Sequence, residues 1–162
     1  MTGSNKPHLL TKDGLARLQA EYQRMTTIGR EELAERLHRA FEDGADSDFV
    51  DNAELEAARN AQAFLEGRIQ EIQTILSNYQ LINESKRKTS TVRVGSWVTV
   101  SEEGEDMEEK YQVVGAAEAD PVEGRISNES PLGIALVGSK VGDVVRVNAP
   151  RGILEFRIVK ID

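Results

Sequence analysis

The chain concentrates carboxylates between residues 40 and 58, where no Lys or Arg lies between Arg39 and Arg59. The acidic residues of this stretch are Glu42, Asp43, Asp46, Asp48, Asp51, Glu54 and Glu56. Like charges this close together repel one another and gain nothing locally. A cluster without counter-charges suggests a partner that supplies them, which is either a metal ion or a basic surface.

A solvated turn between two helices is the alternative interpretation of this stretch. Asp51 and Glu54 fall where the N-cap and the third residue of a helix would lie, and carboxylates there favour the helix dipole. Glu42 and Asp43 lie near the C-terminal end of the preceding helix, where anions are unfavourable. The pattern alone leaves the solvated turn and a functional tip about equally supported.

Asp48 and Asp51 are the residues of this stretch with the clearest chemistry, because they lie three apart at the start of a helical pattern. Carboxylate oxygens suit Mg²⁺ or Mn²⁺, but Mg²⁺ holds its water and needs more ligands than two exposed carboxylates provide. The two acids therefore predict a half-site that is completed inside a partner's site. A second metal ion there could activate water for phosphodiester hydrolysis.

Other catalytic constellations are missing from the sequence. His8 and His38 lie in a tail and on a helix face, and neither has a plausible nucleophile nearby in the sequence. The sequence contains no P-loop, dinucleotide fingerprint or zinc motif. Carboxylates are therefore the only catalytic candidates.

Two long helical patterns flank the acidic stretch. Thr11 can cap a first helix that opens at Lys12, and its heptad pattern loses phase at residues 26–29, where we expect a kink or short break. Its apolar positions are Leu15, Leu18, Tyr22, Met25, Leu33, Leu37 and Ala40 or Phe41. The second helix should begin at Asp51 or Asn52 and extend for roughly 40 Å at 1.5 Å per residue. Its apolar seam is Leu55, Ala58, Gln62, Leu65, Ile69, Ile72, Leu76 and Tyr79.

The second half of the chain changes to the period-two pattern of strands. Residues 83–90 are polar and without periodicity, which is typical of a linker. Strands are expected around 92–100 and at 111–114, 144–147 and 153–161, with one short helix at 130–138 capped by Ser130. The sequence thus predicts an α+β protein. Residues 1–82 would form an antiparallel two-helix coiled coil with its acidic tip near 42–54, and residues 91–162 a small antiparallel sheet with a short helix.

Length, charge and composition exclude several classes of protein. The chain has 162 residues, a formal net charge of -8 and no Cys. No apolar run reaches the length of about 18 residues that a membrane helix needs, and no signal peptide is visible. The acidic balance argues against autonomous binding to duplex nucleic acid, and the lack of Cys fits the reducing cytoplasm. We expect a cytoplasmic monomer without membrane contact.

Several segments of the chain, from about Leu9 to Ile161, resemble the bacterial Gre transcript cleavage factors, the GreA/GreB family, and GreA in particular. In the first half, the resembling segments are residues 48–54, 57–59, 64–69 and 76–78. In the second half, they are residues 130–136, 141–143 and 149–150. Each segment alone is a weak signal, whereas together they are highly specific.

The resemblance implies a coiled coil that passes down the secondary channel of RNA polymerase and an FKBP-like C-terminal domain that docks at the channel rim. Asp48 and Asp51 match the two functional acids of the family, so they would help to hold Mg²⁺ in the polymerase active site. The polymerase would then hydrolyse backtracked nascent RNA and restart. The factor would have no enzymatic activity alone and would belong to the DNA-binding transcription regulators only as a member of that complex.

The same resemblance gives candidates for the contacts with polymerase and RNA. By position in the family pattern, Asp120, Ser130, Pro131 and Leu132 would dock on polymerase, although Pro131 equally fits simple helix initiation. The basic residues that flank the tip are candidates for contact with the RNA 3′ end, while solvated helix faces account for them as well. They are Arg36, Arg39 and Arg59.

The tip departs from the family pattern in ways that leave the direction of the effect open. Asp51 stands where the family usually has Glu, and Val50 replaces a basic residue. Asp43 and Asp46 add carboxylates, as inhibitory Gre homologues do, and the tip also matches DksA-type initiation regulators, whose zinc-binding cysteines this chain lacks. The alternatives are therefore a channel inhibitor or initiation regulator with the same tip, and an unrelated coiled-coil adaptor whose acids are only solvated.

Overall fold

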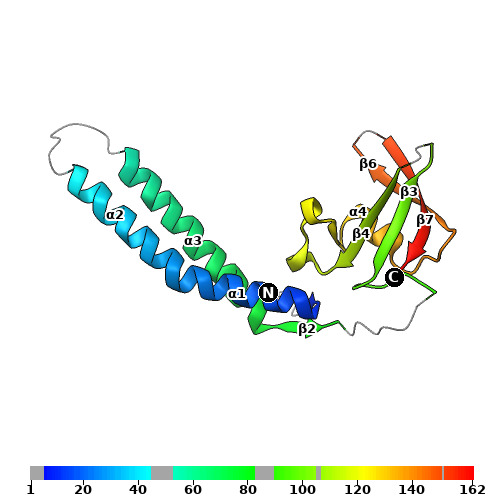
Figure 1. Ribbon diagram of the computed structural model, residues 1–162, viewed down its shortest axis with the longest axis horizontal. Helices are drawn as coiled ribbons and strands as arrows, with labels where there is room; N and C mark the ends of the chain where they lie inside the picture. The colour runs from blue at the N-terminus through cyan, green and yellow to red at the C-terminus, as the bar shows by residue number, and fades with distance from the viewer. Residues whose placement is uncertain (1–5, 45–52, 83–89, 105–106, 151) are drawn as a thin grey trace, which may run out of the picture. The chain divides into compact units, whose positions relative to one another are not determined.

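The computed structural model describes residues 6–44, 53–82, 90–104, 107–150 and 152–162. The chain divides into two compact units, one formed by Leu15–Ser77 and the other by Met1–Gly14 together with Asn78–Asp162. The first is a hairpin of helices and the second contains the sheets (Figure 1). The predicted α+β class is confirmed.

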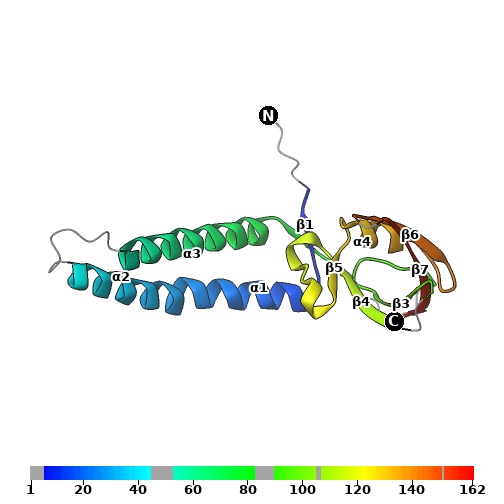
Figure 2. The ribbon, with the colours of Figure 1, turned by 90° about the horizontal axis from the view of Figure 1, so that it is seen from above.

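The helical hairpin is built from α1 (Lys12–Arg24), η1 (Met25–Gly29), α2 (Arg30–Gly44) and α3 (Ala53–Ser77). Figure 2 shows α2 and α3 side by side. The start of α3 lies within two residues of the predicted one, whereas Asp51 and Asn52 are outside the described residues.

The predicted kink or break at residues 26–29 is instead one turn of π-helix, and α1 continues through η1 into α2. From Met25 to Leu33 the spacing is eight residues, one more than a heptad. A π-turn absorbs one extra residue and returns the following apolar positions to the same face. Gly29 contributes because a Cβ on it would lie 3.2 Å from the Leu65 side chain of α3.

The seam between the helices follows the prediction in part. Of the two alternatives on α2, Ala40 is buried and Phe41 is 54% exposed. On α3, Gln62 is exposed and Ile75 rather than Leu76 is buried, whereas Tyr79 lies exposed beyond the end of the helix. A strict heptad pattern drifts relative to a helix of 3.6 residues per turn, which explains why Ile75 takes the place of Leu76.

Ion pairs tie the helices together along the outside of the seam. Arg68 on α3 donates from Nε and Nη2 to both carboxylate oxygens of Glu21 on α1, at 2.8 and 3.1 Å. Arg30 on α2 makes the same forked contact with Glu66 on α3, at 2.8 Å for both hydrogen bonds.

The larger sheet has five strands in the order β5-β4-β3-β7-β6. They are β3 (Trp97–Glu102), β4 (Glu108–Val114), β5 (Arg125–Ser127), β6 (Val144–Ala149) and β7 (Gly152–Ile161). The predicted wholly antiparallel sheet is corrected to a mixed one, because β5 was not expected and pairs with β4 in parallel. Val92, predicted within the first strand, is buried in the core but lies before β3. Its backbone hydrogen bonds go to Gly138 and Ser139 and not to a strand of the sheet.

The short helix α4 (Pro131–Leu136) packs on this sheet as predicted. Ser130 is its N-cap, and Gly138 follows its end with a positive φ of 89°. The core between α4 and the strands consists of Val92, Val98, Val100, Val113, Ile126, Leu136, Val145, Val147, Phe156 and Ile158.

A second, two-stranded sheet joins parts of the chain that the sequence did not connect. β1 (His8–Leu10) pairs in parallel with β2 (Tyr79–Leu81). Residues 6–14 and 78–82 are thereby grouped with the C-terminal sheet, whereas we predicted residues 1–82 as one coiled-coil domain. The predicted linker at 83–90 lies outside the described residues except for Ser90.

Candidate functional site

The acidic segment belongs to the bend of the hairpin. Asp48 and Asp51 lie outside the described residues, so the structure defines the two helix ends that precede and follow them. α2 ends at Gly44 and α3 begins at Ala53. The predicted acids therefore lie in the chain between two packed helices.

Each helix buries a small residue in the part of the hairpin near this bend. Ala40 on α2 is 1% exposed and Ala58 on α3 is fully buried. Side chains of one carbon let two helix backbones come near each other without leaving a cavity. The open end of the hairpin is thus packed.

Arg36 and Glu54 form an ion pair across the open end of the hairpin. Arg36 Nε on α2 donates to Glu54 Oε1 on α3 at 2.7 Å. This hydrogen bond, with the attraction between the charges, holds the pKa of Glu54 below its ordinary value and raises the pKa of Arg36. The predicted RNA-contact residue Arg36 therefore has a structural partner next to the acidic segment.

The other two predicted RNA-contact residues also lie near the bend. Arg39 is exposed on α2, and its Nε lies 3.4 Å from the Glu35 carbonyl oxygen of the same helix. Arg59 is exposed on α3. His38 Nε2 lies 3.4 Å from Glu42 Oε1, one turn further along α2. Both arginines are accessible to a partner of the bend.

The donor chemistry of the acidic segment fits Mg²⁺ only in part. Asp48 and Asp51 supply hard oxygen ligands, but Mg²⁺ prefers six ligands in octahedral geometry. Among the described residues, no group of three or more His, Cys, Asp or Glu side chains could hold a metal ion. Asp48 and Asp51 lie outside that search, and the two of them alone would supply fewer than six ligands.

Asp120, a predicted docking residue, shapes the sheet unit locally. Its Oδ1 accepts from the backbone N–H of Val122 and Glu123, at 3.2 and 3.4 Å, which caps the 3₁₀-turn η3 (Pro121–Glu123). Its Oδ2 accepts from Arg125 Nη2 at 3.0 Å. Asp120 thus holds the following turn in place and keeps part of its carboxylate accessible, with 41% of its side chain exposed.

The remaining predicted docking residues surround the start of α4. Ser130 Oγ accepts from the Gly133 N–H at 3.1 Å and donates to the Ser127 carbonyl at 2.7 Å. Pro131 is exposed as the first residue of the helix, and Leu132 packs partly against the core. Ser130 and Leu132 are thereby used in the fold, and Pro131 is the one of the three that faces solvent.

Exposed apolar side chains near these residues were missed by the sequence reasoning. Val122, whose N–H is capped by Asp120, is 93% exposed, and Ile134 on α4 is 64% exposed. Single exposed apolar residues are common in soluble proteins. The sequence patterns gave no signal for their exposure, because Val and Ile are residue types that usually lie in a core.

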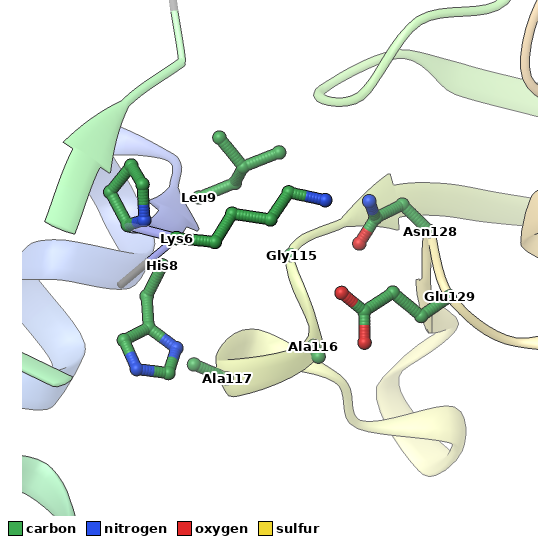
Figure 3. Close-up of a pocket in the computed structure, with 9 residues that line it drawn as sticks. Lys6, His8, Leu9, Gly115, Ala116, Ala117, Asn128 and Glu129 are labelled. Atoms are coloured by element: carbon green, nitrogen blue, oxygen red, sulfur yellow. The ribbon is translucent and has the colours of Figure 1, made fainter. Parts of the chain in front are cut away.

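One pocket of the sheet unit has a volume of about 250 Å³ and lies between the β1 segment and the loops before and after β5. In Figure 3 the Lys6 side chain extends toward the side chains of Asn128 and Glu129. The remaining lining residues are Pro7, His8, Leu9, Gly115, Ala116 and Ala117. The predicted site residues lie elsewhere, so this pocket adds no catalytic group to them.

Within the described residues, no helix combines the length and the apolar character that a membrane span requires.

Family models match both halves of the chain. Residues 8–81 match the N-terminal domain of transcription elongation factors of the GreA/GreB type, and residues 87–162 match the GreA/GreB C-terminal domain. Together these matches cover most of the sequence.

Curated relatives match along nearly the whole chain. Transcription elongation factor GreA of Roseiflexus sp. (strain RS-1) is 49% identical over 98% of this chain and 99% of the relative. GreA of Chloroflexus aggregans is 45% identical over the same shares. Among solved structures, GreA factor homolog 1 (Gfh1) of Thermus thermophilus is 34% identical, with 97% of this chain and 99% of that chain covered and a TM-score of 0.40.

Proposed function

This chain belongs to the GreA/GreB family of transcription elongation factors, and from that premise we propose that it is a transcript cleavage factor of bacterial RNA polymerase. The hairpin enters the secondary channel and brings Asp48 and Asp51 to the polymerase active site. There the polymerase cleaves backtracked nascent RNA, and the arrested complex restarts. The protein is a co-activator without enzymatic activity of its own, and it works as a cytoplasmic monomer.

The observation that carries this proposal is the paired and packed end of the hairpin. Arg36 on α2 pairs with Glu54, which is one of the acidic residues and lies in the first turn of α3, so the pair joins the two helices near the bend. A rigid support reduces the conformational entropy that two carboxylates would lose on binding a metal ion in a partner's site. Carboxylates on a free loop would gain much less from the same contact.

Asp48 and Asp51 would hold Mg²⁺ jointly with groups of the polymerase. Bound in this way, the metal ion supplies activation of water for phosphodiester hydrolysis. The two carboxylates contribute negative charge and oxygen ligands at the end of the hairpin. Arg39 and Arg59, both exposed near the bend, are available to the RNA 3′ end.

Docking on the polymerase rim is assigned to the surface around η3 and the start of α4. Asp120 and Pro131 offer a carboxylate and an exposed ring there, while Ser130 caps α4 and Leu132 packs partly against the core. The exposed side chains of Val122 and Ile134 add apolar area to the same two elements. Apolar anchors beside a charged residue are typical of protein interfaces.

A channel inhibitor or initiation regulator is the second candidate, and one observation favours it. Asp51 is one methylene shorter than the Glu that the family pattern has at this position, and Asp43 and Asp46 add negative charge nearby. A shorter carboxylate reaches less far toward a shared metal ion, whereas the extra acids would still occupy the channel.

The test is RNA cleavage in backtracked elongation complexes of the cognate polymerase with Mg²⁺. We expect the protein to release short 3′ fragments, and Asp48→Asn and Asp51→Asn each to reduce the rate by on the order of 100-fold, as expected for lost metal ligands. Glu56→Gln is the matched control, because it removes an acid on the first turn of α3 without touching the pair.

The wild-type protein separates the two candidates, and Asp51→Glu tests whether the shorter carboxylate limits cleavage. If the protein is a cleavage factor, Asp51→Glu should leave cleavage equal or faster. If the wild-type protein slows nucleotide addition and releases no fragments, it is an inhibitor and the cleavage proposal is wrong.

A further inference from the structure

A buried acidic residue of the sheet unit has no part in the function proposed above. Glu118 in η2 (Ala116–Glu118) is 7% exposed, and Thr11 beside it is 1% exposed. Glu118 Oε2 accepts from the Thr11 N–H at 2.8 Å, and Oε1 accepts from the Thr11 hydroxyl at 2.6 Å. Hydrogen bonds of this length to a carboxylate are strong, and burial limits competition from water.

Thr11 is the residue that caps α1. Its Oγ1 accepts from the backbone N–H of Gly14, the third residue of the helix, at 2.9 Å. In a capping box, the third helical residue is Glu or Gln, and its side chain bonds back to the N–H of the cap. Here that residue is glycine, and the missing carboxylate comes from Glu118, 107 residues further along the chain. The capping box is complete but split between two distant segments.

Glycines make this arrangement possible. A Cβ on Gly14 would overlap the Glu118 carboxylate, and a Cβ on Gly115 would overlap the backbone of Leu9. By contrast, Gly67 in the middle of α3 has no atom near the position of its missing Cβ. Gly14 and Gly115 are therefore where the start of α1 and the η2 segment come into close contact.

The contact lies within the sheet unit, yet α1 leads out of it. The unit ends at Gly14, and from Leu15 onward α1 belongs to the hairpin unit. Backbone hydrogen bonds also fix the segment before α1, because Ile82 N donates to the Leu10 carbonyl at 2.7 Å and β1 pairs with β2. The first turn of α1 is thus fixed to the sheet unit by a side chain of that unit.

We propose that Glu118 is a positioning residue, which through the split capping box restricts the directions in which the hairpin can leave the sheet unit. This inference rests on the proposed function for its consequence, since direction matters when the sheet unit docks and the tip must reach a distant site. A hairpin arm of about 38 Å that turns by about 10° at its base displaces its tip by about 7 Å. Misplacement of reacting groups by about 1 Å can cost about 100-fold in rate.

The variants that test the proposal separate the capping of α1 from the contact between the start of α1 and η2. Glu118→Ala removes the cap on the Thr11 N–H and also this contact. The double variant Gly14→Glu/Glu118→Ala restores a local capping box in the sequence Thr-Lys-Asp-Glu but leaves the link broken. Glu118→Gln keeps the volume and one acceptor for the Thr11 N–H. Gly67→Ala is the matched control for glycine replacement in a helix.

The readout is the distribution of distances between two labels in the free, full-length protein. The chain has no Cys, so Gln70→Cys on α3 and Asn148→Cys on β6, both exposed positions, accept labels without further changes. Pulsed electron–electron double resonance between two spin labels should give a broader distance distribution for Glu118→Ala and for the double variant. The distribution should be of intermediate width for Glu118→Gln and unchanged for Gly67→Ala. Helix content of the double variant should equal that of the wild type.

Cleavage assays give the second readout. At saturating factor, the double variant should lose roughly tenfold or more in cleavage rate, with polymerase affinity changed less than about twofold. A distance distribution that stays narrow in both Glu118→Ala and the double variant overturns the proposal. A broadened distribution with no cleavage by the wild type would keep the positioning role and refute the proposed function instead.

Discussion

Arg36 has a predicted role in RNA contact and an observed contact with Glu54. The sequence places it among basic side chains near the tip, where RNA contact is one interpretation. The structure pairs it with Glu54 across the hairpin, with 43% and 57% of the two side chains exposed. Exposed ion pairs contribute little to stability, so the value of this pair lies in where it holds the helix ends.

A double-mutant cycle at this pair distinguishes the two roles. If Arg36 acts by holding Glu54, then Arg36→Ala and Glu54→Ala reduce cleavage to a similar extent, and the double variant is no worse than either single one. Cleavage rates at saturating factor are the measurement, and Arg39→Ala serves as the comparison. Additive losses would mean that Arg36 contacts RNA independently of Glu54.

The π-turn is the feature of interest at the scale of elements. In η1, Thr26 Oγ1 donates to the Tyr22 carbonyl at 2.8 Å and Thr27 Oγ1 to the Gln23 carbonyl at 2.7 Å. These side-chain hydroxyls thus donate to backbone carbonyl oxygens of the preceding turn, which adjoins the wider π-turn. This single extra residue keeps Leu33, Leu37 and Ala40 in phase with the first half of the helix.

Removing one residue should therefore lower stability much less in η1 than in α2. Deletion of Thr27 restores a heptad spacing between Met25 and the next leucine, so the melting temperature should stay within about 3 °C of wild type. Deletion of the exposed Glu35 turns Leu37 and Ala40 away from α3, and the melting temperature should fall by at least about 5 °C. Thermal unfolding followed by circular dichroism measures both. Equal losses would show that the π-turn is not a phase correction.

At the scale of the whole molecule, the two units are stabilised differently. The described core cluster of buried apolar residues lies within the sheet unit. The hairpin adds cross-helix ion pairs to a narrow seam, and Arg30 and Arg36 hold the pKa values of Glu66 and Glu54 below their ordinary value of 4.5. Stability from a carboxylate with a lowered pKa is present above its unfolded-state value and is lost as the pH falls through the folded-state value.

The cross-helix pairs should make the helical signal of the hairpin depend on pH in acid. Helix content, which comes mainly from the hairpin, should begin to fall below pH 4.5. Glu66→Gln should reduce this pH dependence slightly, because its pair with Arg30 no longer titrates and exposed pairs contribute little. Circular dichroism during acid titration is the measurement, and an unchanged pH dependence in Glu66→Gln would contradict the role of the pair.

Local patterns were sufficient to predict much of the fold and the general location of the candidate site. The helices follow from heptad spacing, α4 from the cap at Ser130 and the proline after it, and the acidic bend from charge alone. Each of these depends on residues within one or two turns of one another. The roles of Asp48 and Asp51 and the tip's partner stay predictions, because both acids lie outside the described residues.

Neighbouring residues were enough to predict the helices, the caps, the acidic bend and the family resemblance, because each of these patterns lies within a short segment. The parallel pairings of β1 with β2 and of β4 with β5, and the contact of Thr11 with Glu118, exist only in the folded chain. These join segments whose local patterns contain no signal for one another. A backbone edge or a buried carboxylate is satisfied by whichever group the fold brings to it, and Glu118 lies 107 residues from Thr11 along the chain.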